Sequence, residues 1–205
     1  MTALDSRIGF LAPPYARTEN ALQRLLRRLE AAEPTGYAHA LAVETLSVEA
    51  ARLLSVGKPL LGALRLGAFL HDVGKLEIPD SILRKSGPLD SSEWASMREH
   101  PAIGMRILSP IIRSEETLSI VLLHHERWDG TGYPRRLAGA DTPLTARIVA
   151  VADAFQAMIE PRPYRPPLTC DEALRELRAN AGWQFDPECV GAVCEAVARR
   201  DPHDL

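Results

Sequence analysis

The residues best suited to chemistry in this chain are histidines and aspartates set in apolar stretches. His71 is followed directly by Asp72 in the run LGAFLHDVGK, and His124 and His125 close an apolar run. A carboxylate buried in an apolar helix is costly without a partner, and a cation is the simplest partner. Three further residues lie in segments with the same helical pattern: His39, His100 and Asp153. The sequence therefore predicts a metal centre.

The expected centre holds two metal ions and hydrolyses a phosphodiester. Imidazole and carboxylate ligands fit iron, manganese or zinc, and the cysteines form no CxxC pair that would favour a thiolate site. Two ions about 4 Å apart share a bridging carboxylate, for which Asp72 is the candidate. Such a pair activates a shared water for attack on phosphorus. Lys75, one helical turn beyond His71, is expected to meet the phosphate or protonate the leaving oxygen.

The composition limits the class of protein. The chain has 205 residues, of which 46% are hydrophobic and 25% charged, and this is enough for one compact domain. Lys and Arg number 24 against 27 acidic residues, so no basic surface for a long nucleic acid is expected. The N-terminus lacks a signal-peptide pattern, and the apolar stretches are too short for a membrane span. We expect a cytoplasmic protein.

Helical signals dominate the chain, and an all-α fold is predicted. Apolar residues recur three and four apart from Ala40 to Leu54, after which Gly57 and Pro59 end one helix and open the next. The segment Ala146 to Phe155 is β-branched but has no partner strand, so a helix is expected. Capping boxes are expected at Asp90 with Glu93 and at Thr169 with Glu172, and Pro101 and Pro187 suit first turns.

Loops and an amphipathic segment complete the expected organisation. The segment Glu19 to Ala32 has leucines on one side, and a packing helix, an oligomer contact and the remnant of a regulatory domain remain open for it. Loops that suit substrate contacts are expected at Ser86–Leu89, Asp129–Pro143 and Glu160–Pro167.

A series of motifs along the chain resembles the HD-GYP domain. They are HDVGK (His71–Lys75), IPD (Ile78–Asp80), EHP around His100, HHERWDGTGYP (His124–Pro134), ARIVAVADAF, RPYR (Arg162–Arg165) and FDP (Phe185–Pro187). With His39 the resemblance covers roughly residues 36–190. It divides the chain into an accessory helix or regulatory stub at 1–34, an HD-GYP domain at 35–200 and a tail at 201–205.

The resemblance implies an HD-superfamily helical bundle that hydrolyses cyclic di-GMP to linear pGpG, and in some members onward to GMP. It implies two divalent ions, iron or manganese, with zinc also compatible. One ion would be held by His39, His71, Asp72 and Asp153, and Asp72 would bridge to a second held by His100, His124 and His125. Asp72 and Lys75 take the catalytic roles, and Lys75, Tyr133, Arg162 and Arg165 would bind substrate.

Departures from the family pattern refine this expectation. Members with a third metal carry a glutamate where this chain has Thr35, a frequent aspartate is Gln156, and a common arginine is missing near Ala42. We therefore expect two metals and a reaction that stops at the linear product. Trp128 suits either stacking on a guanine or a packing role.

Three other functions remain open. The first is hydrolysis of another cyclic nucleotide by the same centre. The second is a cyclic di-GMP receptor with little turnover, whose Gly130–Pro134 loop recruits a diguanylate cyclase or a sensor protein. The third, a di-iron redox enzyme, is disfavoured because Lys75, Arg162 and Arg165 suit a phosphate-bearing substrate. The sequence leaves open whether the chain forms a homodimer.

Overall fold

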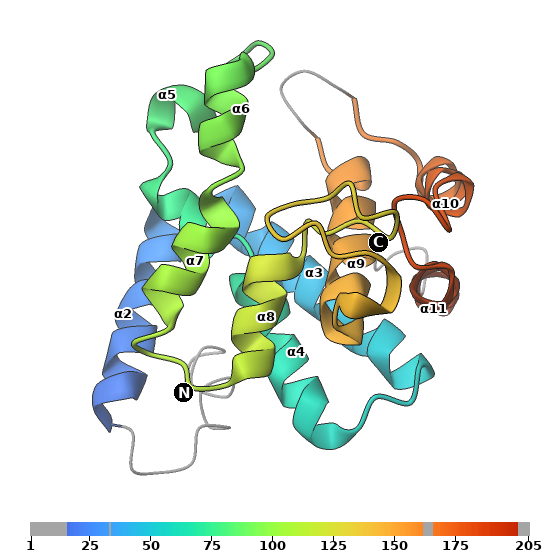
Figure 1. Ribbon diagram of the computed structural model, residues 1–205, viewed down its shortest axis with the longest axis horizontal. Helices are drawn as coiled ribbons and strands as arrows, with labels where there is room; N and C mark the ends of the chain where they lie inside the picture. Colours follow the sequence, from blue (N-terminus) through green and yellow to red (C-terminus); the bar gives the residue numbers. More distant parts are fainter. Residues whose placement is uncertain (1–15, 33, 162–165, 201–205) are drawn as a thin grey trace.

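The computed structural model describes residues 16–32, 34–161 and 166–200, and this part of the chain is helical with no β-strand (Figure 1). The all-α prediction is confirmed. The α-helices are α2 (Ala16–Ala32), α3 (Pro34–Leu53), α4 (Lys58–Leu70), α5 (Asp80–Leu83), α6 (Ser91–Met97), α7 (His100–Leu108), α8 (Glu115–Leu123), α9 (Leu144–Ile159), α10 (Cys170–Ala179) and α11 (Pro187–Ala198). Two short 3₁₀ helices, η1 (Val73–Glu77) and η2 (Gly139–Asp141), lie between them.

The helix boundaries follow the local signals of the sequence. Asp90 accepts hydrogen bonds from the backbone of Ser92 and Glu93 at the start of α6, and the Glu93 side chain returns to the Asp90 amide. The same reciprocal box, formed by Thr169 and Glu172, begins α10. Both predicted capping boxes are therefore confirmed. The segment from Ala146 to Phe155 is helical as predicted, and it lies within α9.

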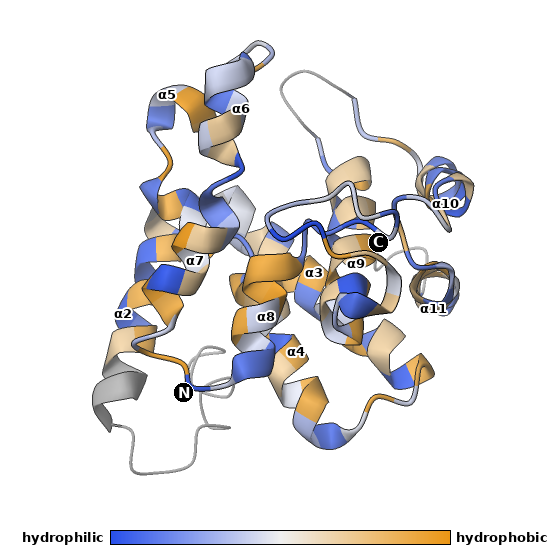
Figure 2. Cartoon of the chain, in the orientation of Figure 1, coloured by the Kyte–Doolittle hydropathy of each residue, from blue (hydrophilic) through white to orange (hydrophobic). Residues whose placement is uncertain are grey.

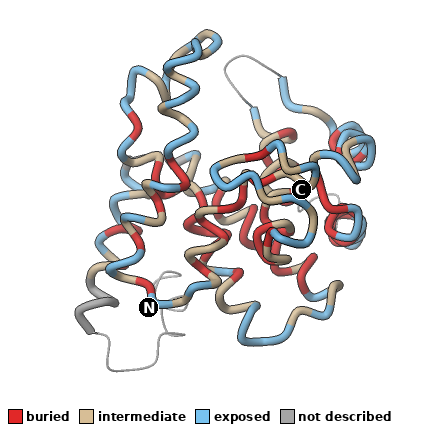
Figure 3. Tube along the Cα trace, in the orientation of Figure 1, coloured by how far each residue is buried: buried red, intermediate tan, exposed pale blue. Residues whose placement is uncertain are grey.

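Two apolar clusters make up the core. The larger joins α3, α4, α8, α9, α10 and α11 through residues such as Leu46, Leu64 and Phe155. The smaller joins α2, α3, the end of α4, η1, α7 and α8 through residues such as Leu22 and Leu108. Figure 1 shows α4 and α8 between these two groups of helices, and in Figure 3 the buried positions are densest there. The three helices α3, α4 and α8 contribute to both clusters.

Helix α2 packs against the rest of the bundle. Leu22, Leu25 and Leu26 are buried in the smaller cluster, while the opposite side of the helix is hydrophilic (Figure 2). Of the three roles left open for the segment Glu19 to Ala32, packing is the one that the structure displays. The division of the chain at residue 34 remains a prediction.

Helices α5 and α6 project from the bundle (Figure 1), and no residue from Pro79 to Glu99 is buried. A capping box and an ion pair between Lys85 Nζ and Glu93 Oε2, 2.5 Å apart, hold this projection together. None of the helices in the described ranges combines the length and the apolar character needed to cross a membrane.

The chain turns at Asp72 instead of continuing as a helix, which corrects the expectation for the run LGAFLHDVGK. Helix α4 ends at Leu70, His71 is its C-cap, and Asp72 is the N-cap of η1. The reason lies in tertiary packing, because Gly74 is pressed against α7. A Cβ atom at Gly74 would stand 1.9 Å from the His100 carbonyl oxygen. Lys75 therefore follows His71 along a 3₁₀ turn.

Candidate metal centre

The structure brings all seven predicted ligands together. One group consists of Asp72, His100, His124 and His125, and a second of His39, His71 and Asp72, with ligand atoms in each group within 4.8 Å of one another. Asp153 joins the second group, since its Oδ1 lies 3.0 Å from His39 Nε2 and 3.8 Å from His71 Nε2. Asp72 is the member that the two groups share.

The two carboxylate oxygens of Asp72 face different histidines. Its Oδ2 lies 3.3 Å from His71 Nε2, whereas its Oδ1 lies 3.2 Å from His100 Nε2 and 3.9 Å from His124 Nε2. A carboxylate oriented in this way can contribute one oxygen to each of two neighbouring ions. This is the geometry expected of a bridging ligand.

Helix ends position most of the histidines. His71 and His124 are the C-caps of α4 and α8, and His100 is the first residue of α7. His39 and Asp153 lie within α3 and α9. The site thus gathers side chains from five helices and the η1 turn, and these elements meet where the two apolar clusters adjoin.

Backbone carbonyls orient three of the imidazole rings. The Nδ1 atoms of His71, His100 and His124 each donate to the carbonyl three residues earlier, over 2.7, 2.7 and 2.9 Å. This bond assigns the proton to Nδ1 and leaves the Nε2 lone pair directed into the cluster. The three rings are therefore held in the tautomer that a metal ion requires.

His39 is held differently, by a carboxylate. Its Nδ1 donates to Glu160, whose two oxygens lie 3.0 and 2.9 Å away, while its Nε2 contacts Asp153. Burial opposes a charge on this ring, but the hydrogen bonds to Asp153 and Glu160 outweigh it and raise the His39 pKa to about 10. Glu160 was missed in the sequence, because it lies 121 residues from His39 with no local pattern to join them.

The electrostatics favour neutral rings at His124 and His125 beside ionised carboxylates, whereas at His71 burial opposes the charge but Asp72 raises the pKa. Burial and the neighbouring histidines lower the pKa of His124 well below its usual value, and burial lowers the His125 pKa to about 4. Burial opposes ionisation of Asp72, yet Lys75 and His71 hold its pKa well below the usual range. Neutral imidazole and ionised carboxylate are the forms of these side chains that bind metal ions.

Unsatisfied polar atoms provide a test of whether a metal fits. Within the described residues, His71 Nε2 and Asp72 Oδ1 are buried without a hydrogen-bond partner. A buried polar atom left unpaired costs about 1–3 kcal/mol, and a coordinated cation would remove that cost. Because both atoms point into a cluster of nitrogen and oxygen donors, the residues present fit a metal centre of the kind that imidazole and carboxylate ligands form.

The predicted substrate residues lie partly beside this cluster. Lys75 Nζ is 2.5 Å from Asp72 Oδ2, and the Tyr133 ring stacks on His125 with centroids 4.8 Å apart. Burial and the nearby Asp72 raise the pKa of Tyr133 above its usual value, so its hydroxyl stays protonated. Arg162 and Arg165 lie outside the described residues.

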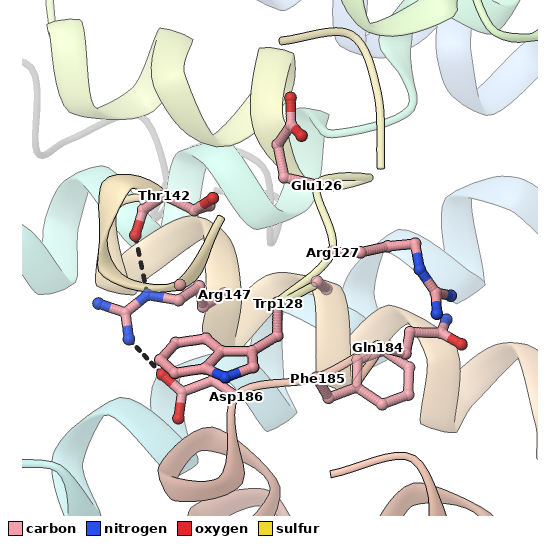
Figure 4. A pocket seen from close by; sticks show the side chains of 10 residues that line it. Glu126, Arg127, Trp128, Thr142, Arg147, Gln184, Phe185 and Asp186 are labelled. Atoms are coloured by element: carbon pink, nitrogen blue, oxygen red, sulfur yellow. Dashed lines mark hydrogen bonds and ion pairs between the residues drawn. The ribbon is translucent and has the colours of Figure 1, made fainter. Parts of the chain in front are cut away.

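Trp128 packs away from the cluster. Its backbone amide donates to the Gln184 carbonyl over 3.0 Å, and the guanidinium of Arg147 lies 5.6 Å from its ring centroid. Arg147 also binds Asp186 and the Thr142 carbonyl, and Figure 4 shows these groups gathered around the indole. Of the two interpretations of Trp128, the packing role is the one observed. It ties the loop after α8 to the segment that precedes α11.

Glu126 is a second residue that sequence analysis did not single out. It is 6% exposed, and its two oxygens accept from the amides of Arg135 and Leu137 over 2.6 and 3.0 Å. It therefore shapes the loop that carries Tyr133. A buried acid directly after a histidine doublet is a signal that could have identified it.

Comparison with known proteins agrees with this fold. The family model described as HD domain matches residues 16–189. A cyclic di-GMP phosphodiesterase of Thermotoga maritima is 42% identical over 158 residues, covering 75% of this chain and 42% of that protein. A cyclic di-GMP phosphodiesterase response regulator of Xanthomonas campestris is 40% identical, and the match covers 89% of this chain and 49% of that protein. A 3'3'-cGAMP-specific phosphodiesterase of Vibrio cholerae is 38% identical, and the match covers 87% of this chain and 34% of that protein.

The solved structures that resemble this chain share its fold. An HDGYP protein of Bdellovibrio bacteriovorus aligns with a TM-score of 0.66 at 23% identity, covering 80% of this chain and 53% of that one. The HD domain of the Listeria monocytogenes phosphodiesterase PgpH, in complex with cyclic di-AMP, aligns with a TM-score of 0.60 at 16% identity, covering 85% and 93%. The chain spans about half or less of the length of the curated relatives named above. The resemblance to HD-GYP domains is confirmed, and the chain belongs to the HD domain family.

Proposed function

We propose that this protein is a two-metal phosphodiesterase that hydrolyses cyclic di-GMP to linear pGpG. The observation that carries the proposal is the orientation of Asp72, whose two oxygens face separate histidine groups. The names of relatives about 40% identical to the chain support the substrate class. Two divalent ions held there, iron or manganese with zinc as the alternative, would supply Lewis acidity for attack of water at phosphorus.

Each residue of the centre has a distinct task. His39, His71 and Asp153 form one set of ligands, His100, His124 and His125 form the other, and Asp72 serves both. Lys75, held beside Asp72, is placed to donate a proton or a hydrogen bond to a phosphate oxygen. Tyr133 bounds the site over His125, and Arg162 and Arg165 bind the phosphates.

The reaction is proposed to stop after one cut. Thr35 and Gln156 are neutral at positions where family members with a third metal or a further acid carry carboxylates. Neutral side chains at these two positions supply no anionic ligand for a third cation. Linear pGpG should therefore accumulate without GMP.

The proposal also includes a protein-contact surface, a cellular location, an oligomeric state and a competing substrate. The Gly130–Pro134 loop, where Thr131 and Pro134 are exposed, is a surface that a diguanylate cyclase or a sensor protein can contact. Cytoplasmic location and a homodimer remain predictions. The competing substrate is 3'3'-cGAMP, because relatives named as specific for it are 36–40% identical to this chain.

The test is anaerobic purification with metal analysis, followed by chromatography of the products formed from cyclic di-GMP and from 3'3'-cGAMP by the iron- or manganese-loaded protein. We expect about two ions per chain and linear pGpG as the product. Asp72→Ala should lose bound metal and turnover together, whereas Asp171→Ala, an exposed aspartate on α10, should keep both. Full turnover by Asp72→Ala would rule out the bridging role. A fully loaded protein without product would favour the receptor function.

A further inference from the structure

A row of flat side chains leads from the candidate metal centre to the surface of α6. The Tyr133 ring stacks on His125 at an interplanar angle of 27°. The guanidinium carbon of Arg98 lies 5.5 Å from the Tyr133 ring centroid and 5.9 Å from that of Trp94. Trp94 ends the row at the surface, where it is 48% exposed. None of these contacts involves a residue assigned to substrate apart from Tyr133.

The position of Arg98 is fixed relative to the metal ligands. Arg98 is the C-cap of α6, and its amide donates to the Trp94 carbonyl over 3.0 Å. The preceding residue, Met97, supplies the carbonyl that orients His100. One turn of α6 therefore both orients a ligand of the cluster and carries the arginine. The start of the same helix is held by its capping box.

The chemistry of the row suits a purine base. Among the described residues, no carboxylate lies within ion-pair distance of Arg98, so its N–H edge is not committed to an acid. A guanidinium fork donates two hydrogen bonds to O6 and N7 of a guanine. An exposed indole offers a stacking surface for the base. A phosphate group would use the guanidinium but would gain nothing from the indole.

We propose that Arg98 and Trp94 form a guanine-binding subsite of the metal centre, with Tyr133 between them and His125. The proposal rests on the proposed function, because it assumes that a cyclic dinucleotide is cut at the metals. It assigns one base of the substrate to α6, a projecting element that carries no metal ligand. The arginine reads the edge of the base, and the indole covers its face.

Tryptophan fluorescence tests the stacking contact. In stopped-flow mixing of metal-loaded protein with cyclic di-GMP, we expect quenching before turnover, and none with ribose 5-phosphate, which has no base. Trp94→Phe should lose most of the quenching. Trp183→Phe, which removes an indole that is 69% exposed, is the matched control and should keep it. Quenching that persists unchanged in Trp94→Phe would overturn the subsite.

Substitution of Arg98 tests the edge contact. Arg98→Ala should raise the KM for cyclic di-GMP about tenfold, the equivalent of about 1.4 kcal/mol, and change kcat less than threefold. Bound metal should equal that of the wild type. Arg98→Lys, which keeps the charge but loses the fork, should not restore the KM.

The outcomes separate this proposal from the function on which it rests. A normal KM in Arg98→Ala, rescue by lysine, or loss of metal in either variant would overturn the guanine subsite while wild-type hydrolysis continued. Rescue by lysine would identify a phosphate contact instead, and loss of metal would identify a structural role. If the wild type cut no cyclic dinucleotide, the function itself would fail.

Discussion

At the residue level, four histidines of the candidate metal centre donate a hydrogen bond from Nδ1, and the acceptor differs among them. His71, His100 and His124 donate to backbone carbonyls, whereas His39 donates to the Glu160 carboxylate. A carboxylate that accepts a hydrogen bond from one imidazole nitrogen fixes the ring and makes the other nitrogen a more basic metal ligand. His39 is therefore expected to bind its ion more tightly than a carbonyl partner would allow.

Removing this partner should weaken metal binding. Glu160→Ala is expected to lower the metal affinity of the His39 group about 10–100-fold, the usual cost of losing such a partner. Glu160→Gln keeps an acceptor without the charge, so its metal affinity should lie between those of the wild type and Glu160→Ala. Competition with a calibrated chelator under anaerobic conditions measures the affinity. Glu49→Gln is the matched control, since Glu49 is 35% exposed against 32% for Glu160 and binds Arg200 at a distance from the site. Equal affinities in all variants would contradict the role.

Sequence analysis can single out a residue when its neighbours in the chain indicate its role. The doublets at His71 and His124 pointed to candidate ligands because two adjacent metal-binding side chains are costly to bury in an apolar run unless a cation binds them. Glu160 and Arg98 act on the site through contacts that only the folded chain creates, so they had no comparable pattern. Trp128 stayed ambiguous because an aromatic before a glycine-rich turn suits packing and stacking equally.

At the level of elements, the distance between the two ligand groups depends on how η1 meets α7. Gly74 and Gly104 lie at this contact, and a Cβ atom at Gly74 would stand 1.9 Å from the His100 carbonyl oxygen and 2.7 Å from the Gly104 amide nitrogen. Backbone atoms cannot move aside as a side chain can. The contact thus places Asp72 beside His100 by backbone packing.

Gly74→Ala should force η1 away from α7. We expect a loss of about 3 kcal/mol in the free energy of unfolding, at the upper end of typical overpacking costs, together with reduced metal content. Chemical denaturation and metal analysis measure the two effects. Gly87→Ala is the control, because a Cβ atom there meets nothing within 4 Å, and it should change stability by less than about 0.5 kcal/mol. A Gly74→Ala protein as stable as the control would show that the contact yields easily.

Helix boundaries were predictable where caps decide them, and not where packing does. Asp90 and Thr169 begin their helices as their capping boxes predicted. The turn at Asp72 interrupts a run that reads as one helix, because the gain from seating Gly74 against α7 exceeds the local preference for helix. The same limit applies to the two apolar clusters. Ile120 and Val121 are adjacent in sequence yet belong to different clusters.

At the level of the whole molecule, bound metal should act as a cross-link. The candidate ligands come from α3, the end of α4, η1, α7, the end of α8 and α9, which together span both apolar clusters. A ligand that binds only the folded chain stabilises it by about 2.7 kcal/mol at a hundred times its Kd. Bound metal would therefore contribute to folding as well as to chemistry.

Chelation should lower the melting temperature by about 5–10 °C, given a shift of about 2–4 °C per kcal/mol for a chain of this size. Calorimetry of the metal-loaded and stripped protein, with return of the metal as a reversal, measures the effect. The stripped Asp72→Ala variant is the control and should gain no stability from added metal. A wild-type melting temperature that is independent of metal would mean that the ligands are already held rigidly without it.

The shared carboxylate of Asp72 also links the loading of the two ligand groups. An ion held in one group would orient the carboxylate for the other and withdraw negative charge from it, so each ion would change the affinity of the other by the same factor. A half-loaded chain is then a distinct species with its own affinity for the second ion. Because hydrolysis would need both ions, the active fraction of the protein would respond to metal supply more steeply than the occupancy of either group alone.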